Sequence, residues 1–574
     1  MKRIYNLSIL AFLIIAASCG KKFLEQTPQG SLTSEQLTTP QGVEDLLISA
    51  YGLMNGNING TWGNYAPAPS MWLFGEVAAD DAHKGSSSTD QSYMNEIEKH
   101  TPTTNNDNLS ITWNNYYEGI IRCNNTLSFL TKVKALTTGE KIDADRAVVI
   151  EAEAKMLRAH YYFLLYRLFI HIPYLDESIT TTADAGALKN DQDILPKIEA
   201  DLQFAVTNLP DGHPLGDVGR SNKLAAQAYL AKLYLYEKKY PEALALFKTV
   251  IAAKPALTAM PFQNNFNITT ENGDEGIFVV QNIINADGSG DNANVGDMLS
   301  GFYGTAPVNC CGFSQPSIDL VNAYKVDANG LPYLDNSYRT NPYTSDMLLS
   351  GTAKNNYKLD QTLAFDPRLD YTVGRRGVPY RDWGVMPGDA WIRDPAYAGP
   401  FVGFKSMINQ ADFSGNTVAG GTYITGLNIN IIRLADVYLM AAECAIETGD
   451  LTSALNWVNA VRARAATLPV VSVNGSPAAS YKVSQYPSFP NVDYARSAVR
   501  FERRLELAME GQRWFDLIRW GIAKTTIESY SQFEGTYLEN NKGITFDADK
   551  DTYYPIPQSQ MDRSNGALTQ NNGY

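Results

Sequence analysis

The chain has 574 residues and a formal net charge of −14 at pH 7, and hydrophobic and charged residues make up 44% and 19% of it. This balance is ordinary for a globular protein and provides enough apolar side chains for a large core. The acidic charge argues against nucleic-acid binding, which needs clustered Lys and Arg, and against attraction of the folded surface to an anionic membrane. The 33 Tyr indicate either a binding face or a hydrated, loop-rich surface.

The N-terminal segment has the pattern of a secretory signal. Two basic residues begin the chain, residues 7–17 form a short apolar run, and small residues directly precede Cys19. This run is too short to span a membrane, so residues 1–18 are predicted to be a signal peptide. Such a cleavage site predicts that the thiol of Cys19 is lipidated and that residues 19–29 form a tether. The alternative is an ordinary signal peptide that happens to have a Cys near its end.

The lipid is the only membrane anchor that the sequence predicts. No other run reaches the roughly 18 apolar residues that a membrane-spanning helix requires.

Residues 30–261 are predicted to be mostly helical. The clearest helix covers 142–170, where apolar residues recur at steps of three and four before Pro173 stops the helix. The recurring residues are Ala152, Met156, Ala159, Phe163 and Tyr166.

Two later segments resemble each other. Residues 224–250 and 439–461 share a pattern of small and apolar residues at an offset of 211, and each is typical of two helices joined by a short turn. This spacing fits tetratricopeptide-type hairpins, in which small residues let two helices approach closely. The alternative is an ordinary antiparallel helix pair.

Residues 262–430 differ from the rest of the chain. They are rich in Asn, Gly, Asp, Tyr and Pro, which predicts loops and short elements, and a long irregular segment of this kind is usually functional. Residues 431–574 contain the second hairpin, a final helix at about 495–522 and an irregular tail. The expected architecture is therefore mainly α: a helical-repeat superhelix with a large loop-rich subdomain on one face.

Several sequence blocks resemble the SusD/RagB family of Bacteroidetes surface lipoproteins. They occur in the family's order and span essentially the whole mature chain. The blocks are Cys19 with FLE at 23–25, RLADVYLMAAE at 433–443, ERRLELAMEGQRWFDLIRWG at 502–521, YPIPQ at 554–558 and LTQNNGY at 568–574.

The resemblance implies a superhelix of tetratricopeptide-like pairs with an irregular C-terminal subdomain. It further implies binding of oligosaccharides or related nutrients at the outer face of the outer membrane. The implied partner is a TonB-dependent transporter of the SusC type, over which the lipoprotein acts as a lid.

The block at 502–521 carries many charges, and we interpret them as structural. Opposite charges three residues apart are neighbours on a helix surface. They predict an ion-pair lattice on a core helix rather than a catalytic carboxylate pair. The predicted pairs are Arg503–Glu506, Glu510–Arg513, Arg513–Asp516 and Asp516–Arg519.

The cysteines indicate neither a disulfide scaffold nor a metal site. Cys444 lies in a helical pattern and is expected in the core. For Cys310 and Cys311, two buried free thiols are the expected state, and a disulfide between these neighbours is the alternative.

No catalytic motif stands out. The chain has five His and no HExxH, nucleophile elbow or phosphate-cradling loop, so we predict no catalytic residue, metal or cofactor. Asp80 and Asp81, followed by His83, are expected to be a solvated or hydrogen-bonding stretch in a polar loop; an acid/base group or a metal fragment is the alternative.

Sugar capture needs aromatic faces for pyranose rings and polar groups for their hydroxyls. Three loop clusters supply both: one runs from Trp62 towards Asp81, one surrounds Tyr303, and one surrounds Trp383. An isolated Trp in such a loop either stacks on a ligand or anchors the loop on the scaffold. The candidate ligand-binding residues are Trp383 as first choice, then Tyr303, Trp62, Tyr65, Asp81, Arg381 and Asp382.

The sequence therefore predicts a non-catalytic, lipid-anchored outer-membrane protein that captures glycans for a SusC-like transporter. One alternative is a mainly structural lid that handles a non-glycan nutrient such as a peptide. The other is a glycoside hydrolase, since the 61 carboxylates include many possible pairs.

Overall fold

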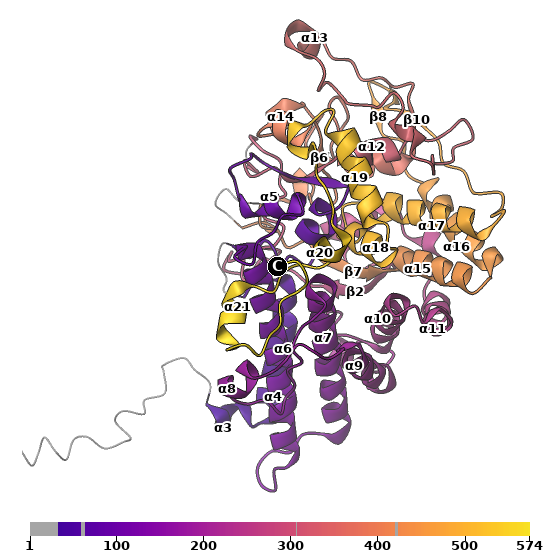
Figure 1. Cartoon of the computed structure of the whole chain (residues 1–574). Coiled ribbons are helices and arrows are strands. Elements are labelled where there is room, and N and C mark those ends of the chain that lie inside the picture. The colour runs from indigo at the N-terminus through magenta and orange to yellow at the C-terminus, as the bar shows by residue number, and fades with distance from the viewer. Residues whose placement is uncertain (1–32, 59–62, 306, 419–422) are drawn as a thin grey trace, which may run out of the picture.

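The computed structural model describes residues 33–58, 63–305, 307–418 and 423–574. The signal peptide, Cys19 and Trp62 lie outside these residues. Figure 1 shows long helices in the lower half of the molecule and an irregular, loop-rich part above them.

The helices form a continuous array in which each packs against the next, which confirms the predicted mainly α superhelix. In packing order they are α4 (Pro40–Gly52), α6 (Asp107–Lys134), α7 (Ala144–Phe169), α9 (Leu195–Asn208), α10 (Lys223–Tyr236), α11 (Tyr240–Ala252), α15 (Leu434–Glu447), α16 (Leu451–Ala465) and α17 (Val492–Leu507). A stack of this kind buries a continuous core between successive pairs.

The predicted long helix at 142–170 is α7. Asp143 caps its N-terminus, and the carboxylate of Asp143 accepts a hydrogen bond from the backbone N–H of Arg146 at 2.8 Å. Such a cap satisfies a backbone donor that the first turn leaves unpaired. The helix ends at Phe169, and the next residue, Ile170, has a positive φ of 54°.

The two similar segments form helical hairpins, α10–α11 and α15–α16, as predicted. Ala231 and Ala442 are completely buried, consistent with close approach of the paired helices. Helix α11 packs directly on α15, although the two hairpins are far apart in the chain.

The irregular segment lies between these hairpins and is closed at its base by a two-stranded sheet. Strand β2 (Gly276–Val280) pairs antiparallel with β7 (Ile429–Arg433), so the chain leaves and returns to the helical array at one place. The other elements within the segment are β3 (Phe313–Pro316), α12 (Ile318–Ala323), α13 (Gly351–Asn355), β4 (Ala364–Phe365), β5 (Val373–Gly374), α14 (Pro395–Ala398) and β6 (Val402–Gly403).

Both ends of the chain contribute to the loop-rich part. Strand β1 (Ala82–Gly85) pairs antiparallel with β3, and β10 (Ser480–Tyr481) pairs in parallel with β4. Other short α-helices and strands are α3 (Ser34–Leu37), α5 (Tyr93–Glu98), α8 (Thr182–Gly186), β8 (Ser472–Val473), β9 (Ser476–Pro477), α20 (Ala548–Asp551) and α21 (Gln558–Arg563).

The prediction of one continuous helix at about 495–522 is wrong. The structure has α17, then an irregular stretch, then α18 (Arg513–Arg519) and α19 (Ala523–Glu534). In that stretch Met509 and Gly511 both adopt positive φ, at 64° and 72°. A side chain at Gly511 would collide with the backbone of Ser70, so this break follows from a close contact with a distant segment.

The predicted charge lattice is also different from the one observed. Among the described residues, only Asp516–Arg519 of the four pairs is formed, at 2.8 Å. Arg503 instead pairs with Asp436 at 2.7 Å, and Arg513 pairs with Asp80 at 2.7 Å. The charged residues of this block belong to a buried ion-pair network that joins α17 and α18 to other segments. Their predicted structural role therefore stands, but most of their ion-pair partners differ from the predicted ones.

The cysteine prediction was wrong at one point. Cys310 and Cys311 form a disulfide with each other instead of two free thiols. Cys444 is buried and free, as predicted, and so is Cys123.

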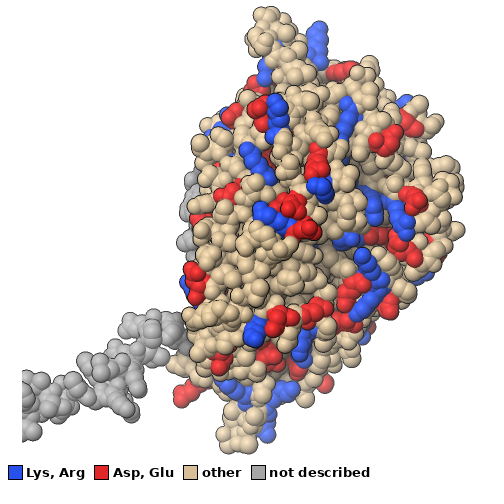
Figure 2. All heavy atoms as spheres, in the orientation of Figure 1, with Lys and Arg blue, Asp and Glu red and all other residues tan. Residues whose placement is uncertain are grey.

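The surface carries mixed charge. On the face shown in Figure 2, basic and acidic side chains are interspersed, with no broad area of one sign. No helix among the described residues is long and apolar enough to cross a bilayer.

Candidate functional site

Tyr303 is the predicted aromatic residue that the structure exposes most clearly. Its relative exposure is 37%, and the guanidinium of Arg393 lies 5.7 Å from the centre of its ring. Arg393 in turn donates hydrogen bonds to Asp90 at 2.6 Å and to the hydroxyl of Ser86 at 3.0 Å. An open aromatic ring therefore stands beside charged hydrogen-bond donors and acceptors.

The loop that carries Tyr303 is closed by backbone hydrogen bonds. The N–H groups of Cys311 and Gly312 both donate to the carbonyl of Gly301, at 3.1 and 2.7 Å. Phe302 points inward and stacks on buried Trp391 with a ring separation of 4.1 Å. With Phe302 held in the core, the next side chain, Tyr303, is directed outward.

The loop that carries Asp90 is tied to the same region by strand pairing. At the end of β1, Gly85 pairs with Phe313 of β3, and the N–H of Ser86 donates to Gly312 at 2.6 Å. The ammonium of buried Lys84 holds the loop from inside by donating to the carbonyls of Ser87 and Asp90, at 2.7 and 2.5 Å. Burial lowers the pKa of Lys84 to about 8.

Tyr65 lies near this cluster but is buried, with 6% exposure. Burial raises the pKa of its hydroxyl, and the charge of Asp90 raises it further, which places the two side chains within electrostatic reach. Tyr65 is therefore the one described member of the first cluster that the charge of Asp90 reaches, and it is buried. We refer to Tyr303, Arg393 and Asp90, with the loops that carry them, as the Tyr303 face.

The third predicted cluster has mainly anchoring contacts. Trp383 is half-buried, donates from Nε1 to the carbonyl of Ile408 at 2.9 Å, and packs its ring against Phe302 and Phe413 at 5.3 and 5.7 Å. These contacts hold the 380–384 turn against the rest of the insertion. The role of Trp383 as a ligand contact stays a prediction, and its contacts favour the alternative that it anchors the loop on the scaffold.

The neighbours of Trp383 have similar roles. The carboxylate of exposed Asp382 accepts from the N–H groups of Gln410 and Ala411, at 2.6 and 2.9 Å. The guanidinium of Arg381 donates to the carbonyls of Phe266 and Phe404, at 3.0 and 3.2 Å. Each side chain closes a loop, and the role of both residues as ligand contacts stays a prediction.

Asp81 is not on the surface. Its exposure is 0%, and its carboxylate pairs with Arg504 of α17 at 2.7 Å. Asp80 is buried beside it, and His83 lies between Glu98 and Glu534 at 3.2 and 2.9 Å. Asp80 and Asp81 are therefore hydrogen-bonded, as one half of the prediction had it, but they are buried instead of solvated. A carboxylate buried in this way is not available to a ligand.

Sequence reasoning missed Arg393 and Asp90. Arg393 lies in the same loop-rich insertion as Trp383, but Asp90 lies 303 residues away from Arg393 along the chain. A lone Asp in a polar loop has no local feature that marks it. The pair becomes visible only when β1 and the insertion are seen to meet.

An all-helical repeat scaffold that carries aromatic and polar loops on its surface defines a class of binding scaffolds. Two family models match the chain: one described as "Starch-binding associating with outer membrane" over residues 22–235, and the SusD family over residues 274–574. The second match covers more than half of the chain. The chain belongs to the SusD family.

Known relatives cover nearly the whole chain. SusD-like protein P25 of Formosa agariphila is 25% identical over 539 residues, which are 92% of each chain. A solved laminarin-binding SusD-like protein is 23% identical, with a TM-score of 0.63 and coverage of 93% of this chain and 100% of the other. Surface glycan-binding protein A of Bacteroides thetaiotaomicron, solved with laminarihexaose, has the same TM-score and coverage at 19% identity. At these identities the structural matches establish the fold.

Proposed function

We propose that this protein captures glycans at the cell surface through its Tyr303 face and does not transform them. The observation that carries the proposal is the exposed Tyr303 ring beside the Arg393–Asp90 pair. An aromatic ring offers a flat surface to the C–H face of a pyranose, while guanidinium and carboxylate groups bind hydroxyls. The match of residues 22–235 to a family model described as "Starch-binding associating with outer membrane" supports the same ligand class.

The chemistry of this face suits binding better than hydrolysis. The carboxylate of Asp90 is engaged by Arg393 and by Ser86, so it is held as a hydrogen-bond acceptor rather than as a free acid or nucleophile. A glycosidase needs two carboxyl groups placed on either side of the scissile bond.

A shallow face of this kind is expected to bind weakly. Free energies of about 4–8 kcal/mol correspond to dissociation constants in the millimolar to micromolar range. We propose that lipidation of Cys19 holds the protein in the outer membrane beside a SusC-like TonB-dependent transporter. Tethering then raises the effective ligand concentration at the transporter and compensates for weak binding.

The test is a binding screen with the purified protein against a panel of polysaccharides and oligosaccharides. Laminarin is placed first, because two structural neighbours are described with laminarin or laminarihexaose. Tyr303→Ala is compared with Tyr234→Ala, which removes a partly buried Tyr from α10 in the helical array. We expect one glycan class to bind, Tyr303→Ala to weaken it about tenfold or more, and Tyr234→Ala to leave it unchanged.

The other outcomes are equally informative. If glycan binding survives Tyr303→Ala, glycan capture remains the function but the Tyr303 face is not its site. Absence of binding to every glycan refutes the proposal and favours a lid that handles another nutrient, such as a peptide. Release of reducing sugar by the purified protein refutes the non-catalytic assignment.

A further inference from the structure

A pocket separate from the Tyr303 face lies where the loop-rich insertion meets the helical array. Its walls come from the segment before the short π-helix Trp72–Val77, the loop at 297–300, the residues after β6, the start of β7 and the break between α17 and α18. It encloses about 650 Å³, including the space open to solvent.

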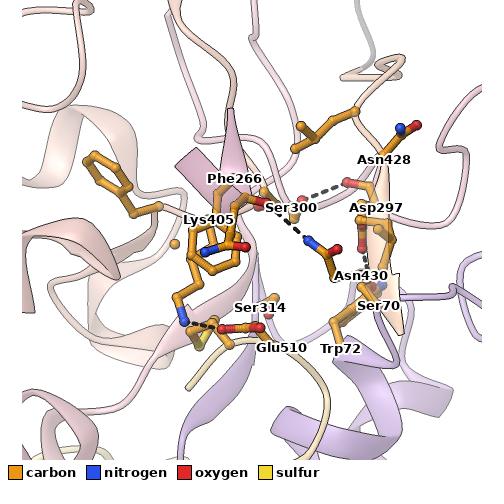
Figure 3. A pocket seen from close by; sticks show the side chains of 17 residues that line it. Ser70, Trp72, Phe266, Asp297, Ser300, Ser314, Lys405, Asn428, Asn430 and Glu510 are labelled. Atoms are coloured by element: carbon orange, nitrogen blue, oxygen red, sulfur yellow. Dashed lines mark hydrogen bonds and ion pairs between the residues drawn. The ribbon is translucent and has the colours of Figure 1, made fainter. Parts of the chain in front are cut away.

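One wall carries a buried carboxylate without a cationic partner among the described residues. Asp297 is 4% exposed and accepts hydrogen bonds from the hydroxyl of Ser70 at 2.5 Å and from the amide of Asn294 at 2.7 Å. Figure 3 shows Asp297 and Ser70 side by side in this wall. An ionised carboxylate offers about four lone-pair sites. The two recorded bonds leave capacity for further donors.

Asn265 also lines the pocket, and its buried side-chain oxygen is an unpaired hydrogen-bond acceptor. Asn265 is 8% exposed, and its amide nitrogen donates to the carbonyl of Phe262 at 3.1 Å and to Glu275 at 2.7 Å. Its side-chain oxygen has no hydrogen-bond partner. A buried unpaired acceptor costs on the order of 1–3 kcal/mol, so a ligand hydroxyl or a water molecule at this point is favoured.

The cation in the pocket is already neutralised. Lys405 donates to Glu510 at 2.5 Å and to the carbonyl of Glu506 at 3.1 Å, and Glu510 also accepts from Arg433 at 2.7 Å. Figure 3 shows Lys405 and Glu510 directed toward each other. An anionic ligand would therefore meet acceptors without a free positive charge. The polar walls favour a neutral ligand that donates hydrogen bonds.

Part of the remaining lining is apolar. Phe266, Phe404, Leu427 and Met509 line the pocket together with Trp72, whose Nε1 is already bonded to the carbonyl of Gly296 at 3.1 Å. Some walls carry groups that can accept hydrogen bonds from a ligand's hydroxyls, and others are aromatic or aliphatic. This combination matches a pyranose ring, which has polar edges and C–H faces.

We propose that this pocket is a second binding site, for one neutral, hydroxyl-rich ligand of monosaccharide size, such as a single sugar or the end of a chain. It extends the proposed function and rests on it only for the expectation that carbohydrate reaches the protein. Its residues are distinct from Tyr303, Arg393 and Asp90, so the two sites can be disabled independently.

Gly403 offers a way to close the pocket without removing a side-chain hydrogen bond. Its backbone has no positive φ, and an added Cβ would meet the carbonyl of Ser314 at 3.5 Å and Met509 at 3.9 Å, which are ordinary contacts. Gly403→Leu should therefore project a side chain into the lining, while Gly403→Ala serves as its matched control. Asp297→Asn is an independent variant that removes the buried charge and keeps the shape.

The experiment is ligand-observed NMR with D-glucose, D-galactose, D-mannose and D-xylose, each titrated into the purified protein and its variants. We expect at least one sugar to bind to wild type and to Tyr303→Ala. Gly403→Leu should weaken this binding about tenfold or more, Gly403→Ala should retain it, and Asp297→Asn should weaken it severalfold. Oligosaccharide binding at the Tyr303 face should persist in Gly403→Leu.

Failure of this inference is distinguishable from failure of the proposed function. Loss of all monosaccharide binding in Tyr303→Ala, with none lost in Gly403→Leu, assigns the sugar to the Tyr303 face and overturns the second site. So does a crystal structure soaked in the sugar that shows only water beside Asn265. If none of the four sugars binds, the inference is also overturned, whatever the oligosaccharide screen shows. Where Gly403→Leu does not fold, Asp297→Asn decides the result.

Discussion

Glu506 is the centre of the buried ion-pair network, and its substitution gives the sharpest test of how this fold is held together. Its carboxylate pairs with Arg433 of β7 at 2.7 Å and with Arg368 of the insertion at 3.0 Å, and it also contacts Arg464 of α16. All four side chains are at most 1% exposed. One residue of α17 thus joins the insertion, its closing strand and the second hairpin.

Glu506→Gln keeps the shape and removes the charge. Breaking a buried ion pair on one side typically costs about 3–5 kcal/mol, because a buried charge is left uncompensated. Here each arginine retains another carboxylate: Arg368 keeps Asp366, while Arg433 and Arg464 keep Glu275. We therefore expect a loss at the lower end, about 3 kcal/mol in the free energy of unfolding.

The assay is urea unfolding followed by circular dichroism, with linear extrapolation to zero denaturant. The control is Glu539→Gln, because Glu539 is exposed and its amine partner Lys542 lies 3.6 Å away in water. We expect no measurable change for that surface pair. A Glu506→Gln variant whose stability is within about 1 kcal/mol of wild type would refute the view that this network is desolvated and mutually dependent.

Three further predictions follow from other parts of the chain. Burial lowers the pKa of His83, but the hydrogen bonds that its ring donates to the buried carboxylates of Glu98 and Glu534 outweigh this and raise the pKa to about 9. The stabilisation that His83 provides is therefore complete below pH 6.5 and is lost as the pH rises through 9. Unfolding measured from pH 6 to 10 should show a fall of up to about 3 kcal/mol that His83→Gln lacks, and equal falls would contradict this. Trp383→Ala should lower the free energy of unfolding by about 2 kcal/mol and leave glycan affinity within about threefold, whereas lost binding with unchanged stability would make Trp383 a ligand contact. Cys19→Ala should move the exported protein from the membrane to the soluble fraction, and continued membrane association on fractionation would contradict lipidation at this residue.

The helical array could be predicted from the sequence because its signals are local. Apolar spacing within 142–170, the turn after Tyr236 and the small residues of the two hairpins lie within a few turns of one another, and each helix satisfies its own backbone hydrogen bonds. The ordered blocks around Arg433 and Glu502 were likewise enough to indicate the family.

The ion pairs and the helix break could not be predicted, because they depend on segments brought together by folding. Arg513 and Glu510 are close in sequence, yet Arg513 pairs with Asp80, a residue 433 positions away. The chain turns at Gly511 because the backbone of Ser70 approaches it, and a local helical pattern contains no trace of that contact.

The candidate site was predicted only in part, for the same reason. The sequence singled out Tyr303 by its loop composition, and the structure exposes it. It also singled out Asp81 and Trp383, but exposure is a property of the packed molecule: Asp81 is buried against Arg504, and Trp383 is held by Ile408. Composition and periodicity determined which segments are scaffold and which are loops, whereas tertiary packing decided which loop side chains reach solvent and which partners they meet there.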